Sequence, residues 1–244
     1  MKKIILSLIL LIIALNINGQ FNLSSFEPKS NNINKIINFS GYIVGYDQNH
    51  CIPVYSLCLL TKKEAETHVV KRYGGGFINN KDLLNCINKD SYREVIDSVT
   101  KKSKYDIGHL TNAEDETYSG TTEQECFNMA NMCPQLPGFN RGIWKKLEGN
   151  ARTWAEKYDS TIIISGPIIS SCKKEGKLIV PLKFYKVIYF INLNSYVAFI
   201  FDNAKYSENE SVFSHSILIE NLETLSGNVF IFDKSKQIDL NKLK

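Results

Sequence analysis

One segment of the sequence carries an amide, a carboxylate and a guanidinium at spacings that a helix would bring together. The segment is "NRGIWKKLEGNARTWAEKY", and the three side chains are those of Asn140, Glu148 and Arg152. At about 100° per residue, Glu148 lies about 80° and Arg152 about 120° from Asn140, so all three border one side of an apolar stripe. The pattern predicts an amphipathic helix over residues 140–158, with Asn140 in the N-cap position.

A histidine upstream of this segment could complete a reactive site. His109 lies in "YDIGHL", and an imidazole with a pKa of about 6.5 can accept a proton from water at ordinary pH. An imidazole, an amide, a carboxylate and a guanidinium are the groups needed to cleave a phosphodiester. Each also has a structural explanation alone: a packed strand histidine, a helix-capping asparagine, or an ion pair between Glu148 and Arg152.

Magnesium suits this set of donors because it prefers oxygen ligands and keeps several waters. The Asn140 oxygen could then bind the ion directly, and Glu148 could hold its water shell. Arg152 would offset the charge that builds on the phosphate. The expected cofactor is Mg²⁺, with Mn²⁺ or another divalent ion as the alternative.

The surrounding elements predict a mixed α+β domain. Residues 38–60 are rich in aromatic and β-branched residues and form two strands around a polar turn, and residues 61–73 form a charged helical segment. After the helix over 140–158 come three strand-like runs, "STIIISGPII", "LIVPLKFYKVIYFIN" and "SYVAFIFDN". Strands, one long helix and more strands do not make a regular βαβ repeat, so we expect one α+β domain over residues 20–244.

Several motifs, in this order, carry a resemblance to a known family. "YDIGHL", then "NMCPQLPGFNRGIWKKLE", then "YDSTIIISGPI" resemble the secreted DNA/RNA non-specific endonucleases of the ββα-metal fold. Later stretches, "PLKFYKVIYF", "AFIFDN" and "LETLSG", are also similar to that family, so the resemblance runs from about Phe39 to Phe232. It implies a ββα-metal fold with a mixed or antiparallel sheet and a metal-dependent endonuclease that acts on DNA and RNA without strong sequence specificity.

The resemblance also implies roles for individual residues. It makes His109 the general base, Asn140 the direct magnesium ligand and Glu148 the residue that hydrogen-bonds the metal's waters. Asn131 matches an active-site asparagine near the scissile phosphate. Arg152 matches an arginine that contacts a phosphate.

The sequence departs from the family pattern at one motif position. The family usually has Asp-Arg-Gly-His, and this chain has Asp106 and then Ile107. Asp106 is expected to orient the local backbone, whereas an aliphatic side chain at Ile107 cannot contact a phosphate. Lys104 or Arg152 could supply the missing charge. The alternative functions are a weakened homologue that only binds nucleic acid and a phosphodiesterase that acts on another exported substrate.

The N-terminus has the composition of a secretory signal peptide. Two lysines precede an apolar run over residues 4–15, and small or polar residues follow around Gly19. Cleavage there would place the mature chain outside the cell or in the periplasm, without stable membrane association. It would also leave 27 basic residues against 25 acidic ones, so the net charge does not indicate a partner. Contact with DNA or RNA phosphates would come from a local patch, for which Arg141, Lys145 and Lys146 are candidates.

The six cysteines fit an exported protein with disulfide bonds. All lie in the mature part, and an even count permits up to three bridges with 15 possible connectivities. A bridge between Cys126 and Cys133 would brace the site, because these residues lie between His109 and Asn140. A zinc site is the competing interpretation, but no CxxC spacing supports it.

Overall fold

The computed structural model describes residues 21–83 and 86–244, so the expected signal peptide over residues 1–19 lies outside the described residues. Its centre is a six-stranded sheet in the order β1-β2-β3-β6-β9-β10, in which every neighbouring pair is antiparallel. The strands are β1 (Lys35–Asn38), β2 (Tyr42–Asp47), β3 (Ile52–Thr61), β6 (Ser160–Pro167), β9 (Lys183–Phe190) and β10 (Ser195–Asp202).

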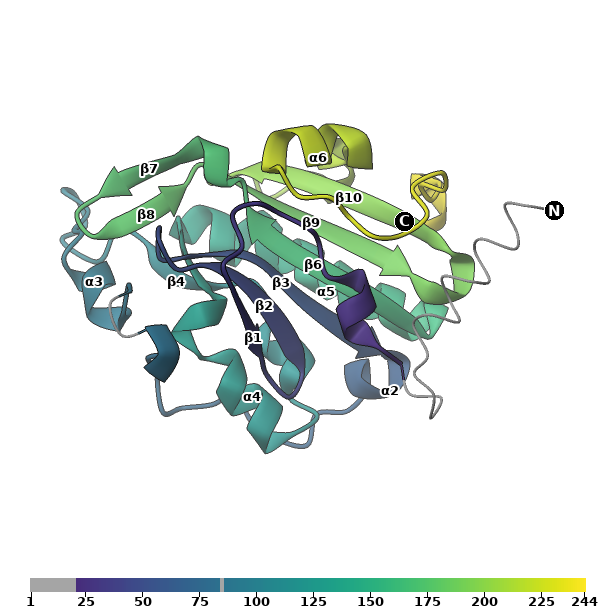
Figure 1. The fold of residues 1–244 in the computed structure, drawn as a ribbon, viewed down its shortest axis with the longest axis horizontal. Coiled ribbons are helices and arrows are strands. Elements are labelled where there is room, and N and C mark those ends of the chain that lie inside the picture. Colours follow the sequence, from purple (N-terminus) through teal and green to yellow (C-terminus); the bar gives the residue numbers. More distant parts are fainter. Residues whose placement is uncertain (1–20, 84–85) are drawn as a thin grey trace.

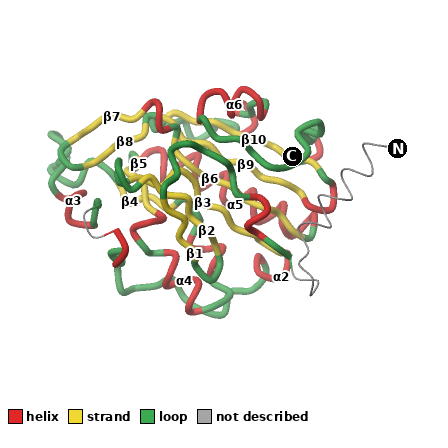
Figure 2. Tube along the Cα trace, viewed as in Figure 1, coloured by secondary structure: helices red, strands yellow, loops and turns green. Residues whose placement is uncertain are grey.

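Two small antiparallel ribbons lie outside this sheet. One consists of β4 (Asp106–His109) and β5 (Met132–Gln135), and the other of β7 (Cys172–Glu175) and β8 (Leu178–Pro181). Figure 1 shows β7 and β8 projecting at one end of the molecule, and Figure 2 shows the strands of the central sheet surrounded by helices and loops. The α-helices are α2 (Lys62–Ala65), α3 (Lys89–Arg93), α4 (Gly120–Cys126), α5 (Lys145–Tyr158) and α6 (Ile219–Ser226).

The expected hairpin over residues 38–60 is confirmed as β2 and β3. Tyr42 pairs with Cys58, and the register shifts by one residue between Gly45 and Tyr46. In the connecting turn, the Asp47 carboxylate accepts hydrogen bonds from the backbone N–H groups of residues 49 and 50. The three later runs of the sequence are also strands, although the second divides into β8 and β9.

Each face of the sheet is covered by its own apolar core. Helix α5 packs on one face with Leu147, Ala151 and Trp154, which join side chains from β2, β3, β9 and β10. On the other face, Phe26 and residues of α6 and the C-terminal segment cover a second cluster that includes Ile162 and Val187. Alternate residues of each strand point to opposite faces, which explains how adjacent strand residues enter different cores. Figure 1 shows α5 behind the sheet, with α6 above β10.

The long helix begins later than the sequence pattern predicts. Its regular part is Lys145–Tyr158, and the preceding Phe139–Trp144 segment is a wide, irregular turn with non-helical backbone angles at Gly142 (φ −103°, ψ −113°). Asn140 is therefore not an N-cap, and the wheel angle that placed it beside Glu148 was wrong. The apolar stripe itself is confirmed, because Ile143, Leu147, Ala151 and Trp154 are all buried.

The charged helix expected over residues 61–73 is mostly absent. Only α2 is helical, begun by a capping box in which Thr61 and Glu64 bond each other's backbone N–H groups. From there the chain crosses to Arg72 and Phe77 without regular structure. The local charge pattern could not show this, because the segment is held by contacts with distant residues, such as the bonds from the N–H groups of residues 69 and 70 to the Thr117 carbonyl.

The cysteines form one disulfide, Cys51–Cys86, which ties the β2–β3 turn to a residue 35 positions downstream. The bridge expected between Cys126 and Cys133 was wrong, since both are buried free thiols. Cys126 packs with Phe127 and points at the Thr111 carbonyl, whereas Cys133 belongs to the core under α5.

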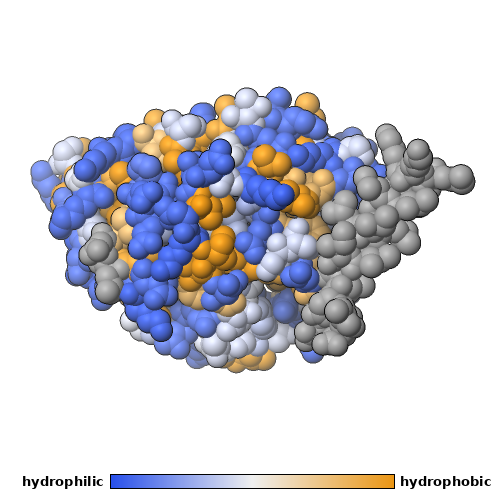
Figure 3. Space-filling model, viewed as in Figure 1, coloured by the Kyte–Doolittle hydropathy of each residue, from blue (hydrophilic) through white to orange (hydrophobic). Residues whose placement is uncertain are grey.

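The surface is largely polar. Figure 3 shows hydrophilic residues covering the β7–β8 end of this face, with hydrophobic residues gathered nearer the middle. Within residues 21–83 and 86–244, no helix is long and apolar enough to cross a membrane.

Candidate active site

His109 ends strand β4, with its ring packed among aromatic side chains. The Phe127 ring meets it edge-on at 4.9 Å between centroids, and the Phe77 ring lies at 5.7 Å. The Trp144 indole N–H donates to the His109 carbonyl at 3.3 Å. The ring's Nε2 atom is buried and has no hydrogen-bond partner among the described residues. These contacts fix the ring while adding no charged hydrogen-bond partner to it.

The same surroundings keep His109 neutral. Burial, with a further contribution from the nearby Arg72 charge, lowers the pKa of His109 to about 3. A neutral imidazole has a lone pair available on one ring nitrogen at physiological pH. His109 can therefore act as a proton acceptor without first losing a proton.

Asn140 lies in the irregular turn before α5 and is oriented by a carboxylate. Its Nδ2 atom donates to Oδ2 of Asp106 at 2.9 Å, and Arg141 binds the same carboxylate through Nε at 2.8 Å and Nη2 at 2.5 Å. A carboxylate only accepts hydrogen bonds, so the amide nitrogen must face Asp106 and the Oδ1 oxygen is left free as a ligand. Asp106 orients a side chain here, rather than the backbone as expected from the sequence.

Glu148 lies one turn into α5 and is buried beneath the same surface. Burial raises its pKa to about 8; the Lys186 and Arg152 cations oppose this rise, and the Asp115 and Glu114 carboxylates add to it. A carboxyl group in this state gains a proton easily and becomes a good hydrogen-bond acceptor once a cation is near.

Two residues predicted for the site lie behind it. Arg152 is bonded to Asp115 at 2.7 Å and to Glu114 at 2.9 Å, and its side chain is 15% exposed. Asn131 is fully buried: its Oδ1 accepts from the Thr111 N–H, and its Nδ2 donates to the Thr111 carbonyl, both at 2.9 Å. Neither residue lines the cavity that contains His109, and Arg152 pairs with residues other than Glu148.

One cavity of about 380 Å³ brings the other predicted residues together. His109, Asn140 and Glu148 line it, with Ile107 on the β4 side. The remaining lining residues are Arg72, Phe77, Asn112, Glu114, Arg141 and Lys145.

Arg72 is the basic residue among the lining residues that the sequence did not reveal. Its guanidinium lies 4.9 Å from the centre of the Phe127 ring, and it forms none of the ion pairs found in the described part of the chain. It is 37 positions upstream of His109, in a segment whose pattern indicated a charged helix. The only local signal was its position just before the Gly74–Gly76 run, which shows flexibility and not proximity.

The sequence matches a known family over most of its length. A model described as DNA/RNA non-specific endonuclease matches residues 19–237. The chain belongs to the DNA/RNA non-specific endonuclease family. The resemblance inferred from the motifs is confirmed, and the endonuclease class expected from them agrees with it.

Several curated relatives of this family match parts of the chain. Nuclease C1 of Cunninghamella echinulata var. echinulata is 30% identical over 54% of this chain and 58% of its own. Nuclease 1, mitochondrial, of Schizosaccharomyces pombe is 26% identical over 77% of this chain and 63% of its own. Endonuclease G, mitochondrial, of Bos taurus is 26% identical over 72% of this chain and 67% of its own. The chain thus spans about six tenths of the length of the first two.

A solved structure shares the fold. The complex titled "Crystal structure of the EndoG/EndoGI complex: Mechanism of EndoG inhibition" contains a chain with a TM-score of 0.72 and 22% identity, covering 89% of this chain and 91% of that one. The α+β, ββα-metal fold expected from the sequence is confirmed.

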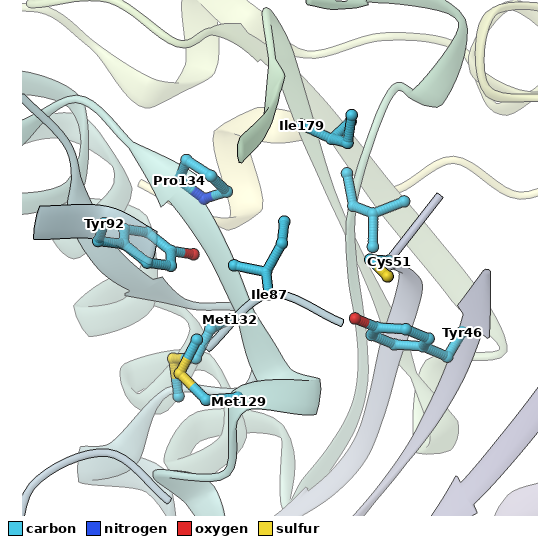
Figure 4. Close-up of a pocket in the computed structure, with 9 residues that line it drawn as sticks. Tyr46, Cys51, Ile87, Tyr92, Met129, Met132, Pro134 and Ile179 are labelled. Atoms are coloured by element: carbon cyan, nitrogen blue, oxygen red, sulfur yellow. The ribbon is translucent and has the colours of Figure 1, made fainter. Parts of the chain in front are cut away.

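Another cavity, near strand β5, is too small to be a second candidate for the active site. Figure 4 shows Tyr46, Tyr92, Met129 and Met132 among the side chains around a small space beneath the β4–β5 ribbon. Its volume of about 10 Å³ would hold about one water molecule. A space of that size cannot admit a substrate, so it is a packing gap.

Proposed function

We propose that this chain is a secreted endonuclease that hydrolyses phosphodiester bonds in DNA and RNA with little sequence preference, using a divalent cation. One observation carries the proposal: a neutral His109, an oriented Asn140 and a buried Glu148 line the same 380 Å³ cavity. Family membership supports the same chemistry.

His109 is the general base in this proposal. A water molecule in the cavity gives its proton to the imidazole and attacks the phosphorus atom of the substrate. The bond from phosphorus to the leaving sugar oxygen breaks as the new P–O bond forms, and that oxygen takes a proton from solvent. The pKa of about 3 keeps the base neutral across the physiological range. The Trp144 bond to the His109 carbonyl holds the base in place during the step.

The donor set fits a magnesium ion. The free Oδ1 of Asn140 is an oxygen ligand, and the Glu148 carboxylate can accept hydrogen bonds from metal-bound waters. Mg²⁺ bound there would offset charge on the phosphate and on the leaving oxygen. Mn²⁺ fits the same oxygen donors and is the alternative ion.

Three cations at the cavity would bind substrate phosphates. Arg72, Arg141 and Lys145 all line it, and a cation that contacts a backbone phosphate does not distinguish one base from another. Binding through backbone phosphates explains low sequence preference and predicts strong salt dependence. We assign Arg152 and Asn131 supporting roles, holding residues 111–115 behind the base, instead of the phosphate contacts expected from the sequence.

The export of this enzyme is also part of the proposal. The signal-peptide pattern would be cleaved near Gly19, leaving a single catalytic domain from residue 20 in the periplasm or outside the cell. The Cys51–Cys86 disulfide supports an oxidising compartment. Detection of the processed chain only in cytosolic fractions would contradict this.

A non-catalytic nucleic-acid-binding module is the second candidate, because Ile107 replaces the usual motif arginine. Plasmid nicking separates the two functions. We expect cleavage with Mg²⁺, none with chelator, and a loss of at least about 10²-fold in His109→Ala. His50→Ala is the matched control, since His50 is exposed and pairs with Asp47. If the wild type binds nucleic acid without cleaving it, the proposed endonuclease function is wrong. If His109→Ala keeps full activity, His109 is not the general base.

A further inference from the structure

A buried lysine lies beneath the proposed active site. Lys186, in strand β9 between β6 and β10, is 2% exposed and forms none of the ion pairs found in residues 21–83 and 86–244. Burying an ammonium group without a contacting carboxylate costs several kcal/mol. A buried lysine is tolerated where other groups contact its ammonium. The groups that contact Lys186 indicate its role.

Polar groups from the sheet hold the ammonium. Nζ of Lys186 donates to Oγ of Ser165 at 2.6 Å, and the strand register places Ser56, Ser165 and Lys186 side by side on β3, β6 and β9. Ser56 in turn hydrogen-bonds the Thr111 hydroxyl at 2.5 Å. The three side chains form a polar row across the sheet face that α5 covers.

This row contacts the two residues that follow the base, and the indole that binds the carbonyl of the base. Nζ of Lys186 reaches the Leu110 carbonyl at 3.5 Å and lies 4.3 Å from the centre of the Trp144 ring. The same indole donates to the His109 carbonyl. Lys186 therefore touches residue 110 directly and residue 109 through Trp144.

Lys186 is also acted on electrostatically by two buried carboxylates. The carboxylates that act on its charge are Glu148 of α5 and Asp115 of the segment after His109, while the Arg152 cation opposes them. Burial lowers the pKa of Lys186, and Glu148 is the first group that counteracts this. For Glu148, Lys186 is likewise the first group that counteracts burial. Each charge makes the other less costly.

We propose that Lys186 is a positioning residue of the active site: its ammonium, held by Ser165, fixes the Leu110 carbonyl and the Trp144 ring behind His109 and supplies the positive charge opposite Glu148. The role of Lys186 in catalysis rests on the proposed function. Its contacts with Ser165, Leu110 and Trp144 do not depend on substrate or metal. No comparison or motif assigns this role to the residue.

The first test uses metal-free protein and needs no activity. Lys186→Met keeps the length of the apolar stem and removes the charge, and Lys183→Met on the same strand is the control, since Lys183 is exposed and pairs with Asp202. We expect the backbone amide signals of Leu110 and Thr111 to shift in Lys186→Met and to stay in place in Lys183→Met. Ser165→Ala removes only the tether and should shift the same signals less. Unchanged signals in both Lys186→Met and Ser165→Ala would overturn the positioning role.

A double-mutant cycle tests the charge pair. Lys186→Met and Glu148→Gln each leave one buried charge without its opposite, whereas the double variant removes both charges. The double variant should therefore lower the urea-unfolding midpoint by less than the sum of the two single variants. Additive losses would overturn the pairing.

The third test measures catalysis. In Lys186→Met we expect kcat to fall about 10²-fold with KM within about twofold, and the acidic limb of the kcat profile to move to higher pH because Glu148 loses its counter-charge. A kcat profile identical to wild type would overturn the catalytic part. A wild type that never cleaves would overturn the proposed function instead, and the metal-free tests would still decide the role of Lys186.

Discussion

The Asp106 carboxylate accepts a hydrogen bond from Nδ2 of Asn140 at 2.9 Å, and this bond decides which atom of the Asn140 amide is free. Without it, either the oxygen or the nitrogen of the amide could face the cavity. With it, the ligand oxygen is presented to the site. The first residue of the Asp106–His109 strand thus prepares the proposed metal ligand, and the last is the proposed base.

Replacing Asp106 with alanine should weaken metal binding. Partners that orient metal ligands typically contribute a factor of about 10 to 100 in affinity, so we expect a rise of that size in the Mg²⁺ dissociation constant, measured by calorimetry. Arg141→Ala removes the other partner of Asp106 and leaves the bond to Asn140, so it should change metal affinity less. Equal affinities in wild type and Asp106→Ala would contradict the orienting role.

The depressed pKa of His109 predicts a pH-dependent stability. The unfolded chain takes up a proton at His109 below about pH 6.5, whereas the folded protein does so only near pH 3. The stabilisation is therefore complete above about pH 6.5 and is lost as pH falls towards 3, at up to about 1.4 kcal/mol per pH unit. Urea unfolding of wild type and His109→Asn between pH 7 and pH 4 should show a shallower slope in the variant. Parallel curves would show that His109 titrates normally.

Arg72 should contribute to substrate binding through its charge. Arg72→Met keeps an apolar contact with Phe127 and removes the cation, so we expect weaker binding of DNA and a salt dependence reduced by about one charge. Fluorescence anisotropy across a salt series measures both. Lys71→Met is the neighbouring control, since Lys71 does not line the cavity. Equal salt slopes in the two variants would exclude a phosphate contact by Arg72.

An arginine introduced at Ile107 should strengthen phosphate binding. Ile107 lines the cavity beside His109 and is partly buried against an apolar cluster, so the longer cation can extend into the open space. We expect Ile107→Arg to lower KM severalfold at low salt, with Ile107→Leu unchanged, in cleavage assays. A KM that rises in Ile107→Arg would mean that the apolar surface at this position itself contacts substrate.

Loss of the Cys51–Cys86 disulfide should destabilise the fold. A closed loop of 35 residues corresponds to about 4 kcal/mol of chain entropy, and we expect Cys51→Ser/Cys86→Ser to lose up to that amount in urea unfolding. Arg72 and Phe77 lie inside this loop, so activity should fall as well. Cys172→Ser serves as the control because Cys172 is a free thiol. Peptide mapping that found another pairing would contradict the assignment.

Elements with local signals could be predicted from the amino-acid sequence. Alternating and apolar runs defined the strands, the 3.6-residue period defined the buried face of α5, and ordered motifs indicated the family. His109, Asn140 and Glu148 were predicted from these motifs, and the fold brings them to one cavity. Local patterns suffice here because strand pairing and helix packing act on the side chains that carry the pattern.

Contacts between residues far apart in the sequence arise from the packing of the folded chain. Gly142 interrupts the helix, so the wheel placed Asn140 wrongly although its assignment to the site agrees with the cavity. Arg152 binds acidic residues 37 and 38 positions upstream, Arg72 arrives from a segment without regular structure, and Lys186 lies under the base from a strand 76 positions after Leu110. Such contacts depend on how the sheet and the helix pack against each other. The spacing of residues in a single sequence carries no information about that packing.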